Sequence, residues 1–309
     1  MTLRDSLDAG AARLGAGPHP GRARRDAETL LLHLLGKNRA WLLTHLDDPF
    51  GGCTAIQFAA LLNRRLTGEP IQYITGEAEF YGLPFHVTRD VLIPRPETEH
   101  LVEAALKILG APGLASETWE SNEPAGGPEP VLSLPKDLAE TWEGSILDVG
   151  AGSGAIAVAL AHHLPHAHIT AIDVSAPALA VAEENAKRNG VSIRFLRGDL
   201  LAPVAQEQFD IVISNPPYVS SADRDALAVE VRDYEPVQAL FAGDDGLEVY
   251  RRLIPAAFAV LAPGGSLALE IGYGQAAAVQ SLLTAAGFQR IQMTPDLQGI
   301  PRVLTAQRT

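Results

Sequence analysis

The chain has 309 residues, a hydrophobic fraction of 47% and a formal net charge of −13. This length suggests two domains, and the acidic balance argues against a protein that grips nucleic acid phosphates. Cys53 is the only cysteine, which excludes intramolecular disulfides and a cysteine-based zinc site, and no apolar run approaches the roughly 20 residues that span a bilayer.

Residues 1–74 predict a small helical domain. The segment begins with charges and lacks the apolar core of a signal peptide, which together with the lone cysteine indicates a cytoplasmic protein. Apolar residues recur at helical spacing, and Gly36 follows the second run where a helix C-cap is expected. The predicted helices cover residues 3–14, 26–35, 40–45 and 55–66.

Residues 75–93 predict a β-hairpin that links this domain to the next. From Gln72 to Val87, aromatic and β-branched residues alternate with polar ones around Gly82–Leu83–Pro84. A helix is expected from Thr98 to Leu109. Residues 111–144 contain five prolines and have a net charge of −6, which indicates a flexible acidic insertion.

From Ser145 onward, short strands alternate with helices, which predicts an α/β domain over residues 94–309 with a doubly wound, mostly parallel sheet. A closing hairpin brings the expected number of strands to seven, with one antiparallel. The predicted strands are residues 145–149, 168–174, 191–196, 209–214, 265–272, 288–293 and 303–306. The predicted helices are residues 155–163, 176–188, 246–261 and 275–286.

A glycine-rich turn, DVGAGSG at residues 148–154, follows the first of these strands. Glycines at the carboxyl edge of a sheet let the backbone approach a ligand closely. The spacing is GxGxG, not the GxGxxG of dinucleotide sites, and a tight turn without a ligand stays an alternative. Asp173 ends the next strand, where its carboxylate can accept hydrogen bonds from both ribose hydroxyls of an adenosine. A helix N-cap role for Asp173 is also open, because Ser175 and Pro177 follow.

Gly198–Asp199–Leu200 follows the third strand, in a position that suits contact with an adenine edge. Asp199 could accept a hydrogen bond from the exocyclic amine while Leu200 packs on the ring. The same sequence is common in plain loops, so this inference stays open.

The NPPY motif, Asn215–Pro216–Pro217–Tyr218, follows the fourth strand and best distinguishes between the possible functions. The two prolines fix the backbone and end the hydrogen-bond ladder. The Asn215 side-chain oxygen and the Pro216 carbonyl oxygen can each accept one N–H of an incoming NH₂, while Tyr218 offers a flat face. Alignment of such a nitrogen with a sulfonium methyl can lower the activation barrier of methyl transfer by about 7–11 kcal/mol. We therefore predict a methyltransferase that uses S-adenosylmethionine, yields S-adenosylhomocysteine and needs no metal.

With these motifs in view, the chain resembles the release-factor glutamine methyltransferase family, from about residue 5 to the end apart from residues 111–144. The matching segments are residues 70–87, 92–106, 146–161, 213–219 and 234–254. The resemblance implies a seven-stranded Rossmann-like class I methyltransferase domain and an N-terminal helical domain that helps hold the partner. It implies methylation of the glutamine of the Gly-Gly-Gln motif in class I peptide chain release factors, giving N5-methylglutamine.

The resemblance also implies residue roles. Asn215, Pro216, Pro217 and Tyr218 would hold the glutamine amide, with Asn215, Pro216 and Tyr218 acting in catalysis. Arg95 and Glu97, beside Pro94, would flank the substrate, although a surface ion pair is an equal alternative for Arg95. By the resemblance, the residues that would contact the donor are Gly150, Ala151, Gly152, Ser153, Gly154, Asp173, Leu200 and Asn215. Asp199 joins this predicted set because of its position after the third strand.

Three other functions compete with this one. An adenine-N6 methyltransferase on DNA or RNA would use the same NPPY chemistry, but the acidic balance and the lack of a basic stripe count against it. An NAD-dependent oxidoreductase conflicts with the GxGxG spacing and the NPPY motif, and the intact NPPY argues against a non-catalytic binding protein. We expect a monomer with no direct nucleic acid or membrane partner.

Overall fold

The computed structural model describes residues 1–110 and 141–309, so most of the expected acidic insertion lies outside the described residues. The chain divides into two compact units. The smaller comprises Met1–Glu77, Val87–Arg89 and Asp225–Glu235, and the larger comprises Ala78–His86, Pro236–Thr309 and the described part of Asp90–Arg224. Within the described ranges, no helix is long and apolar enough to cross a membrane.

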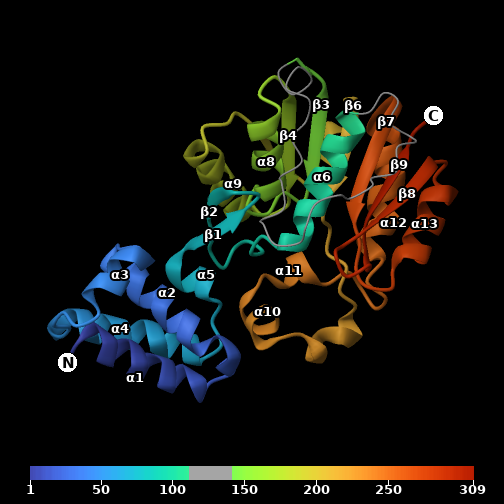
Figure 1. Ribbon diagram of the computed structural model, residues 1–309. Coiled ribbons are helices and arrows are strands. Elements are labelled where there is room, and N and C mark those ends of the chain that lie inside the picture. The colour runs from blue at the N-terminus through green and yellow to red at the C-terminus, as the bar shows by residue number, and fades with distance from the viewer. Residues whose placement is uncertain (111–140) are drawn as a thin grey trace, which may run out of the picture. The chain divides into compact units, whose positions relative to one another are not determined.

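The smaller unit is a helical bundle (Figure 1). Its helices are α1 (Leu3–Gly15), α2 (Ala23–Leu35), α3 (Arg39–His45), α4 (Gly52–Leu66), α5 (Ile71–Thr75) and α10 (Val229–Tyr234), with the 3-10 turn η1 (Pro20–Arg22). Thr2 caps α1 in a capping box, and Gly36 ends α2 at a φ of 61°, a backbone conformation that favours glycine. Apolar side chains of α1, α2 and α4, among them Leu7, Leu30 and Leu62, fill the core.

Buried ion pairs hold α10 to the rest of the smaller unit. Arg65, on α4, is 2% exposed. Its guanidinium lies 2.6 Å from Asp26 on α2 and 2.5 Å from Glu230 on α10, and it donates to the Glu69 carbonyl oxygen at 2.9 Å. A buried cation costs free energy unless it is paired and hydrogen-bonded, and these three contacts meet that requirement.

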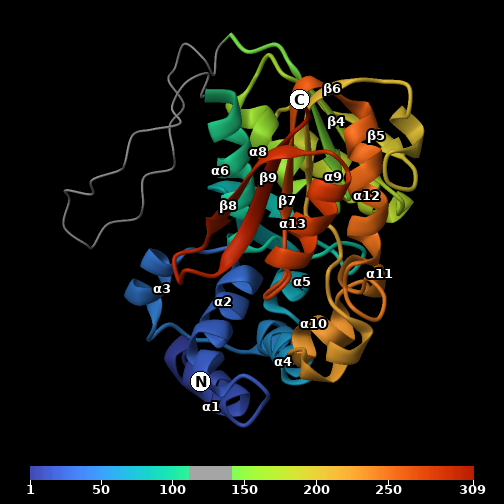
Figure 2. The same ribbon diagram turned by 90° about the vertical axis from the view of Figure 1, so that its right-hand side faces the viewer.

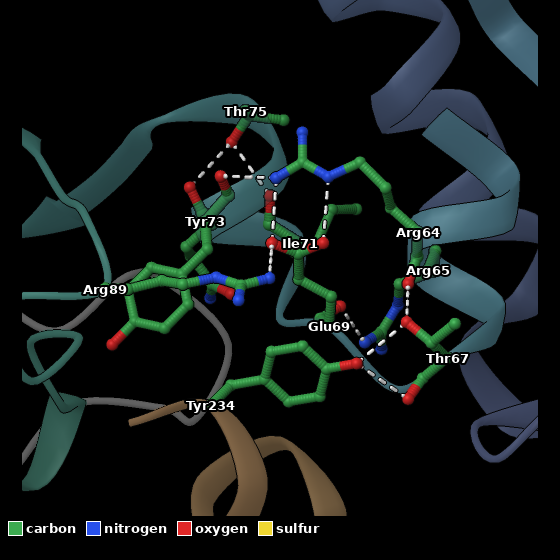
Figure 3. A network of polar contacts seen from close by, with 10 residues as sticks. Arg64, Arg65, Thr67, Glu69, Ile71, Tyr73, Thr75, Arg89 and Tyr234 are labelled. Carbon is green, nitrogen blue, oxygen red and sulfur yellow. Dashed lines mark hydrogen bonds and ion pairs between the residues drawn. The ribbon is translucent and has the colours of Figure 1, made fainter. Parts of the chain in front are cut away.

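Figure 3 shows a second network, centred on the buried carboxylate of Glu69. Arg64 donates to both carboxylate oxygens at 2.8 Å, and Arg89 donates to one of them at 2.7 Å. The hydrogen bonds from Arg64, and then those from Arg89, hold the pKa of Glu69 below its usual range. The Tyr234 hydroxyl donates to the Thr67 carbonyl oxygen at 2.9 Å, and the Tyr234 ring lies 5.1 Å from the Arg89 guanidinium.

The expected hairpin is present but shorter than the sequence predicted. It consists of β1 (Glu77–Phe80) and β2 (Leu83–His86), joined by Tyr81 and Gly82 at φ values of 53° and 72°. Two successive positive φ values are typical of a two-residue type I′ turn, so the turn lies before the Gly82–Leu83–Pro84 centre that the sequence indicated. Residues 71–75 are helical. The Pro70 carbonyl oxygen accepts from the amides of Tyr73 and Ile74, and Gly76 ends the helix with a left-handed backbone conformation.

The larger unit is built on a seven-stranded sheet with the order β5–β4–β3–β6–β7–β9–β8 (Figures 1 and 2). The strands are β3 (Ser145–Val149), β4 (His168–Asp173), β5 (Arg194–Arg197), β6 (Phe209–Ser214), β7 (Leu261–Glu270), β8 (Gln289–Pro295) and β9 (Pro301–Gln307). β3 to β7 are parallel, and β9 is antiparallel to both of its neighbours. The predicted fold, a mostly parallel seven-stranded sheet with one antiparallel strand, is confirmed.

Helices cover both faces of this sheet. The covering helices are α6 (Pro96–Gly110), α8 (Ala155–His163), α9 (Ala176–Arg188), α12 (Glu248–Val260) and α13 (Ala276–Ala285). The chain also forms α11 (Val237–Leu240) and the 3-10 turns η2 (Ala202–Val204) and η3 (Ser221–Ala226). Ile146 joins the core under α6, α8 and α9, whereas the adjacent Leu147 joins the core under α12 and α13. In Figure 2, α6 and α8 lie on one side of the strands and α12 and α13 on the other. Trp142, from the end of the expected insertion, packs against the first of these cores.

β5 begins later than the sequence predicted. The expected strand started at Val191, but β5 starts at Arg194. The Val191 amide donates to the Ala186 carbonyl oxygen at 3.0 Å, closing the end of α9, and it is therefore not available to the ladder.

Candidate active site

The predicted site segments meet at one edge of the sheet in the larger unit. Because β3 to β6 are parallel, their carboxyl ends share that edge. The glycine turn follows β3, Asp173 ends β4, Gly198–Leu200 follows β5 and Asn215–Tyr218 follows β6. This is the edge at which open α/β sheets bind their ligands.

The glycine turn follows a left-handed backbone that suits its residues. Gly150, Gly152 and Gly154 have φ values of 81°, 53° and 79°. A Cβ at Gly154 would lie 3.0 Å from the Cβ of Ala182, so this glycine lets α8 pack closely against α9. A Cβ at Gly150 or Gly152 would meet no atom of the described residues within 4 Å, so these two glycines are needed for the backbone conformation and not for packing against that part of the chain.

Two carboxylates flank the glycine turn. Asp173 accepts from the Gly152 amide and from the Ser175 amide, both at 2.8 Å, while Ser175 itself caps α9. Asp148 is fully buried; its Oδ2 accepts from the Ala157 amide at 3.2 Å, and its Oδ1 has no hydrogen-bond partner among the described residues. Burial, with a smaller contribution from the Asp173 charge, raises the pKa of Asp148 to about 7. The sequence-based prediction included Asp173 but not Asp148 among the binding residues.

The turn after β5 stores backbone strain. Leu200 has a φ of 49°, which is uncommon for a residue with a branched side chain, and it packs half-buried against the second core. A Cβ at Gly198 would lie 2.1 Å from Cγ of Pro203. Asp199 is exposed, and its carboxylate pairs with Arg252. Its contact with an adenine amine stays a prediction.

The turn Asn215–Tyr218, called the NPPY corner below, is held in place by hydrogen bonds and by close packing of the Tyr218 ring. The Ser214 hydroxyl donates to the Val149 carbonyl oxygen at 2.6 Å and so ties the end of β6 to the end of β3. The Gln275 side chain donates to the Tyr218 carbonyl oxygen at 2.9 Å. A Cβ at Gly272 would lie 2.9 Å from Cδ2 of the Tyr218 ring, so only glycine allows this approach.

Two residues outside the predicted site contact the side chains of the corner. Asn215 donates from Nδ2 to the Thr98 hydroxyl at 3.0 Å, and the Tyr218 hydroxyl donates to Oε1 of Glu270 at 3.4 Å. Thr98 is 5% exposed and Glu270, the last residue of β7, is 2% exposed. Burial raises the pKa of Glu270 to about 7, against the lowering effect of hydrogen bonds from Thr98 and Tyr218.

Arg95 and Glu97 lie close enough to the corner to influence its ionisable groups. The Arg95 charge lowers the pKa of Tyr218, although burial and the Glu270 charge raise that pKa overall. The exposed Glu97 acts on Glu270, whose pKa it raises. The segment around Pro94 therefore borders the predicted substrate site, and the individual roles of Arg95 and Glu97 stay predictions.

Two family models match the chain. Residues 5–76 match the PrmC N-terminal domain, and residues 132–231 match the methyltransferase small domain. Among solved structures, the T. thermophilus 16S rRNA N2 G1207 methyltransferase in complex with AdoMet and guanosine is similar with a TM-score of 0.50. That likeness covers 75% of this chain and 50% of that chain at 19% identity, and it shows the fold alone.

Curated relatives match over the full length. The release factor glutamine methyltransferase of Koribacter versatilis is 37% identical over 309 residues, which cover 100% of this chain and 99% of the relative. The release factor glutamine methyltransferase of Moorella thermoacetica is 41% identical over 311 residues, with the same coverage.

Proposed function

The chain belongs to the release factor glutamine methyltransferase family, and from this premise we propose that it methylates the side-chain amide of a glutamine in class I peptide chain release factors. The methyl donor is S-adenosylmethionine, the acceptor is the glutamine of the Gly-Gly-Gln motif and the product is N5-methylglutamine. The observation that carries this proposal is that the NPPY corner lies beside the glycine turn. A hydrogen bond of 2.6 Å from Ser214 to Val149 joins the residues that precede these two segments.

The residues at the sheet edge fit an adenosine that carries a positive sulfur. The glycine turn exposes backbone without side chains, and each Asp173 carboxylate oxygen keeps lone-pair capacity beside its single backbone donor. Asp148 adds a buried carboxyl group whose Oδ1 has no hydrogen-bond partner within the described ranges, which favours a nearby cation over an anion. When bound, S-adenosylmethionine supplies a methyl group that its sulfonium already activates.

The corner compensates for the weak nucleophilicity of an amide nitrogen. The lone pair of that nitrogen is delocalised into the carbonyl group. Asn215 Oδ1 and the Pro216 carbonyl oxygen accept the two N–H groups, which shifts electron density onto the nitrogen, while Tyr218 packs against the planar group. Orientation of this kind can contribute about 7–11 kcal/mol without a strong base. The proton leaves after the transfer, when the nitrogen is cationic and acidic.

The helical unit is proposed to hold the release factor, because its residues match the domain that characterises the family. A monomeric state and the absence of direct nucleic acid or membrane partners stay predictions. The alternative activity, adenine-N6 methylation, is an outcome that the test below separates.

Mass spectrometry of the Gly-Gly-Gln peptide tests the proposal. The purified protein is incubated with S-adenosylmethionine and a purified release factor, which is then digested. We expect one added methyl group on the glutamine, and none on a release factor in which that glutamine is replaced by alanine. Methyl transfer to DNA or RNA, with none to the release factor, would favour the adenine-N6 alternative.

A further inference from the structure

The orientation of the Asn215 amide decides whether the corner can hold an NH₂ group. The side chain carries an acceptor, Oδ1, and a donor group, Nδ2, and a half-turn of the terminal torsion exchanges them. An incoming NH₂ needs the acceptor. A reversed amide would face it with N–H groups, losing the hydrogen bond and adding repulsion.

Thr98 contacts the donor side of this amide. Asn215 Nδ2 donates to Thr98 Oγ1 at 3.0 Å, although the two residues are 117 positions apart in the sequence. Thr98 lies in the first turn of α6 and is 5% exposed, so bulk water offers no ready alternative partner. An unpaired polar atom at such a position costs free energy, which favours the observed orientation.

The Glu270 carboxylate offers an acceptor for the Thr98 hydroxyl proton. Thr98 lies near enough to this carboxylate to lower its pKa. Oε1 of the carboxylate accepts from the Tyr218 hydroxyl at 3.4 Å, and Oε2 has no hydrogen-bond partner among the described residues. The Tyr250 hydroxyl fixes the same residue by donating to the Glu270 carbonyl oxygen at 2.7 Å. A hydroxyl has one proton, so a Thr98 hydroxyl that points this proton at Glu270 presents only lone pairs to Asn215 and can face Nδ2 but not Oδ1.

We propose that Thr98 and Glu270 are positioning residues that orient the Asn215 amide with Oδ1 toward the substrate NH₂. This inference rests on the proposed function, because only an NH₂ substrate requires an acceptor at this point. Neither residue needs to touch the substrate, since both act through Asn215.

The protonation state of Glu270 makes this arrangement depend on pH. Above its pKa of about 7 the carboxylate accepts from Thr98; below it, the carboxyl group can donate to Thr98. The Thr98 hydroxyl can then rotate so that its own proton points toward Asn215, and this favours the reversed amide. Turnover should therefore fall as the pH drops through about 7. The charged groups that act on Glu270 and Tyr218 are Arg302, Glu97 and Arg95. Both residues act in turn on the buried Tyr250.

Substitution of Thr98 tests the positioning role. Thr98→Val keeps the branched shape and removes the hydroxyl, so we expect kcat for release-factor methylation to fall about 10-fold to 100-fold. The Kd of S-adenosylmethionine, measured by calorimetry, should stay within about twofold. Thr98→Ser restores a hydroxyl and should recover most of the lost kcat. Thr170→Val, which alters another buried threonine on β4, is the matched control and should keep the kcat of the unmodified protein.

Glu270→Gln provides a second readout, which does not depend on whether Thr98→Val folds. A glutamine cannot ionise, so the fall in kcat between about pH 8 and about pH 6 should disappear. Unchanged kcat in folded Thr98→Val, or an unchanged pH profile in Glu270→Gln, would overturn the inference. If the unmodified protein does not methylate the release factor, the proposed function fails instead.

Discussion

Replacing Gly246 with alanine should displace the NPPY corner. Gly246 has a φ of 72°, and a Cβ there would lie 2.3 Å from the Tyr218 carbonyl oxygen and 2.7 Å from Gln275 Nε2. Because real Cβ contacts are essentially never shorter than 3.0 Å, the Gly246 backbone and the corner have to move apart by about 0.7 Å, the difference between 3.0 and 2.3 Å. A misplacement of about 1 Å can cost about 100-fold in rate, so we expect kcat to fall about 10-fold to 100-fold.

Gly243→Ala is the matched control for this prediction. Gly243 has a φ of 76°, so an alanine there carries the same left-handed strain of about 1–2 kcal/mol. Its Cβ would approach Oε2 of Glu248, the end of a flexible side chain, at 2.8 Å. Both variants should therefore lose about 2–8 °C in thermal unfolding followed by circular dichroism. Only Gly246→Ala should lose methyl transfer from labelled donor to the release factor, and equal turnover of the two variants would refute the reasoning.

Three further predictions follow from the described contacts. Asn215→Ala should leave the Kd of S-adenosylmethionine within about tenfold but cut turnover about 100-fold or more, as calorimetry and labelled methyl transfer can measure. Arg65→Met leaves Asp26 and Glu230 without their shared cation, so the free energy of unfolding in urea should fall by about 3–5 kcal/mol. The pKa of Asp148 rises from 3.8 to about 7 on folding, so the folded state binds the extra proton and stability falls as the pH rises from about 4 to about 7. Asp148→Asn should flatten this slope in ligand-free protein, as urea unfolding at several pH values can measure.

Each of these predictions has an outcome that contradicts it. Unchanged turnover in Asn215→Ala would remove that residue from the mechanism. For Arg65→Met, the control is Arg194→Met, whose exposed ion pair should contribute less than about 1 kcal/mol; equal losses in the two variants would show that the burial of Arg65 has no energetic consequence. A pH slope that survives in Asp148→Asn would assign the titration to another group.

The central strands of the larger unit could be predicted because both faces of the sheet are buried there. In β3, Ile146 and Leu147 enter opposite cores, so the strand appears in the sequence as a continuous apolar run before a glycine turn. The α10 segment gives no such signal, since its six residues include no buried one. Its place in the helical unit depends on the Arg65–Glu230 pair and on the Tyr234–Thr67 hydrogen bond, which joins residues 167 positions apart.

The candidate site could be predicted where it follows the ends of strands. The glycine turn, Asp173 and the NPPY corner lie at positions that any parallel sheet brings to one edge. Thr98 could not be found in this way, because no local pattern connects the first turn of α6 to Asn215. Asp148 and Glu270 did leave a signal: each is a carboxylate within an otherwise apolar strand, near its carboxyl end. Buried acids at that position have shifted pKa values, which is typical of functional sites.

The buried carboxyl groups at this edge of the sheet are expected to suit a ligand with a positive sulfur better than a dinucleotide. Burial raises the pKa of both Asp148 and Glu270 to about 7, so each carboxyl group gains from a nearby cation and resists a nearby anion. Asp148 lies two residues before Gly150, where the pyrophosphate of a dinucleotide would approach the glycine turn. An anion near Asp148 would raise its pKa further, whereas a cation near it would lower that pKa. The buried carboxyl group is therefore compatible with the proposed S-adenosylmethionine, and this argument does not depend on the GxGxG spacing.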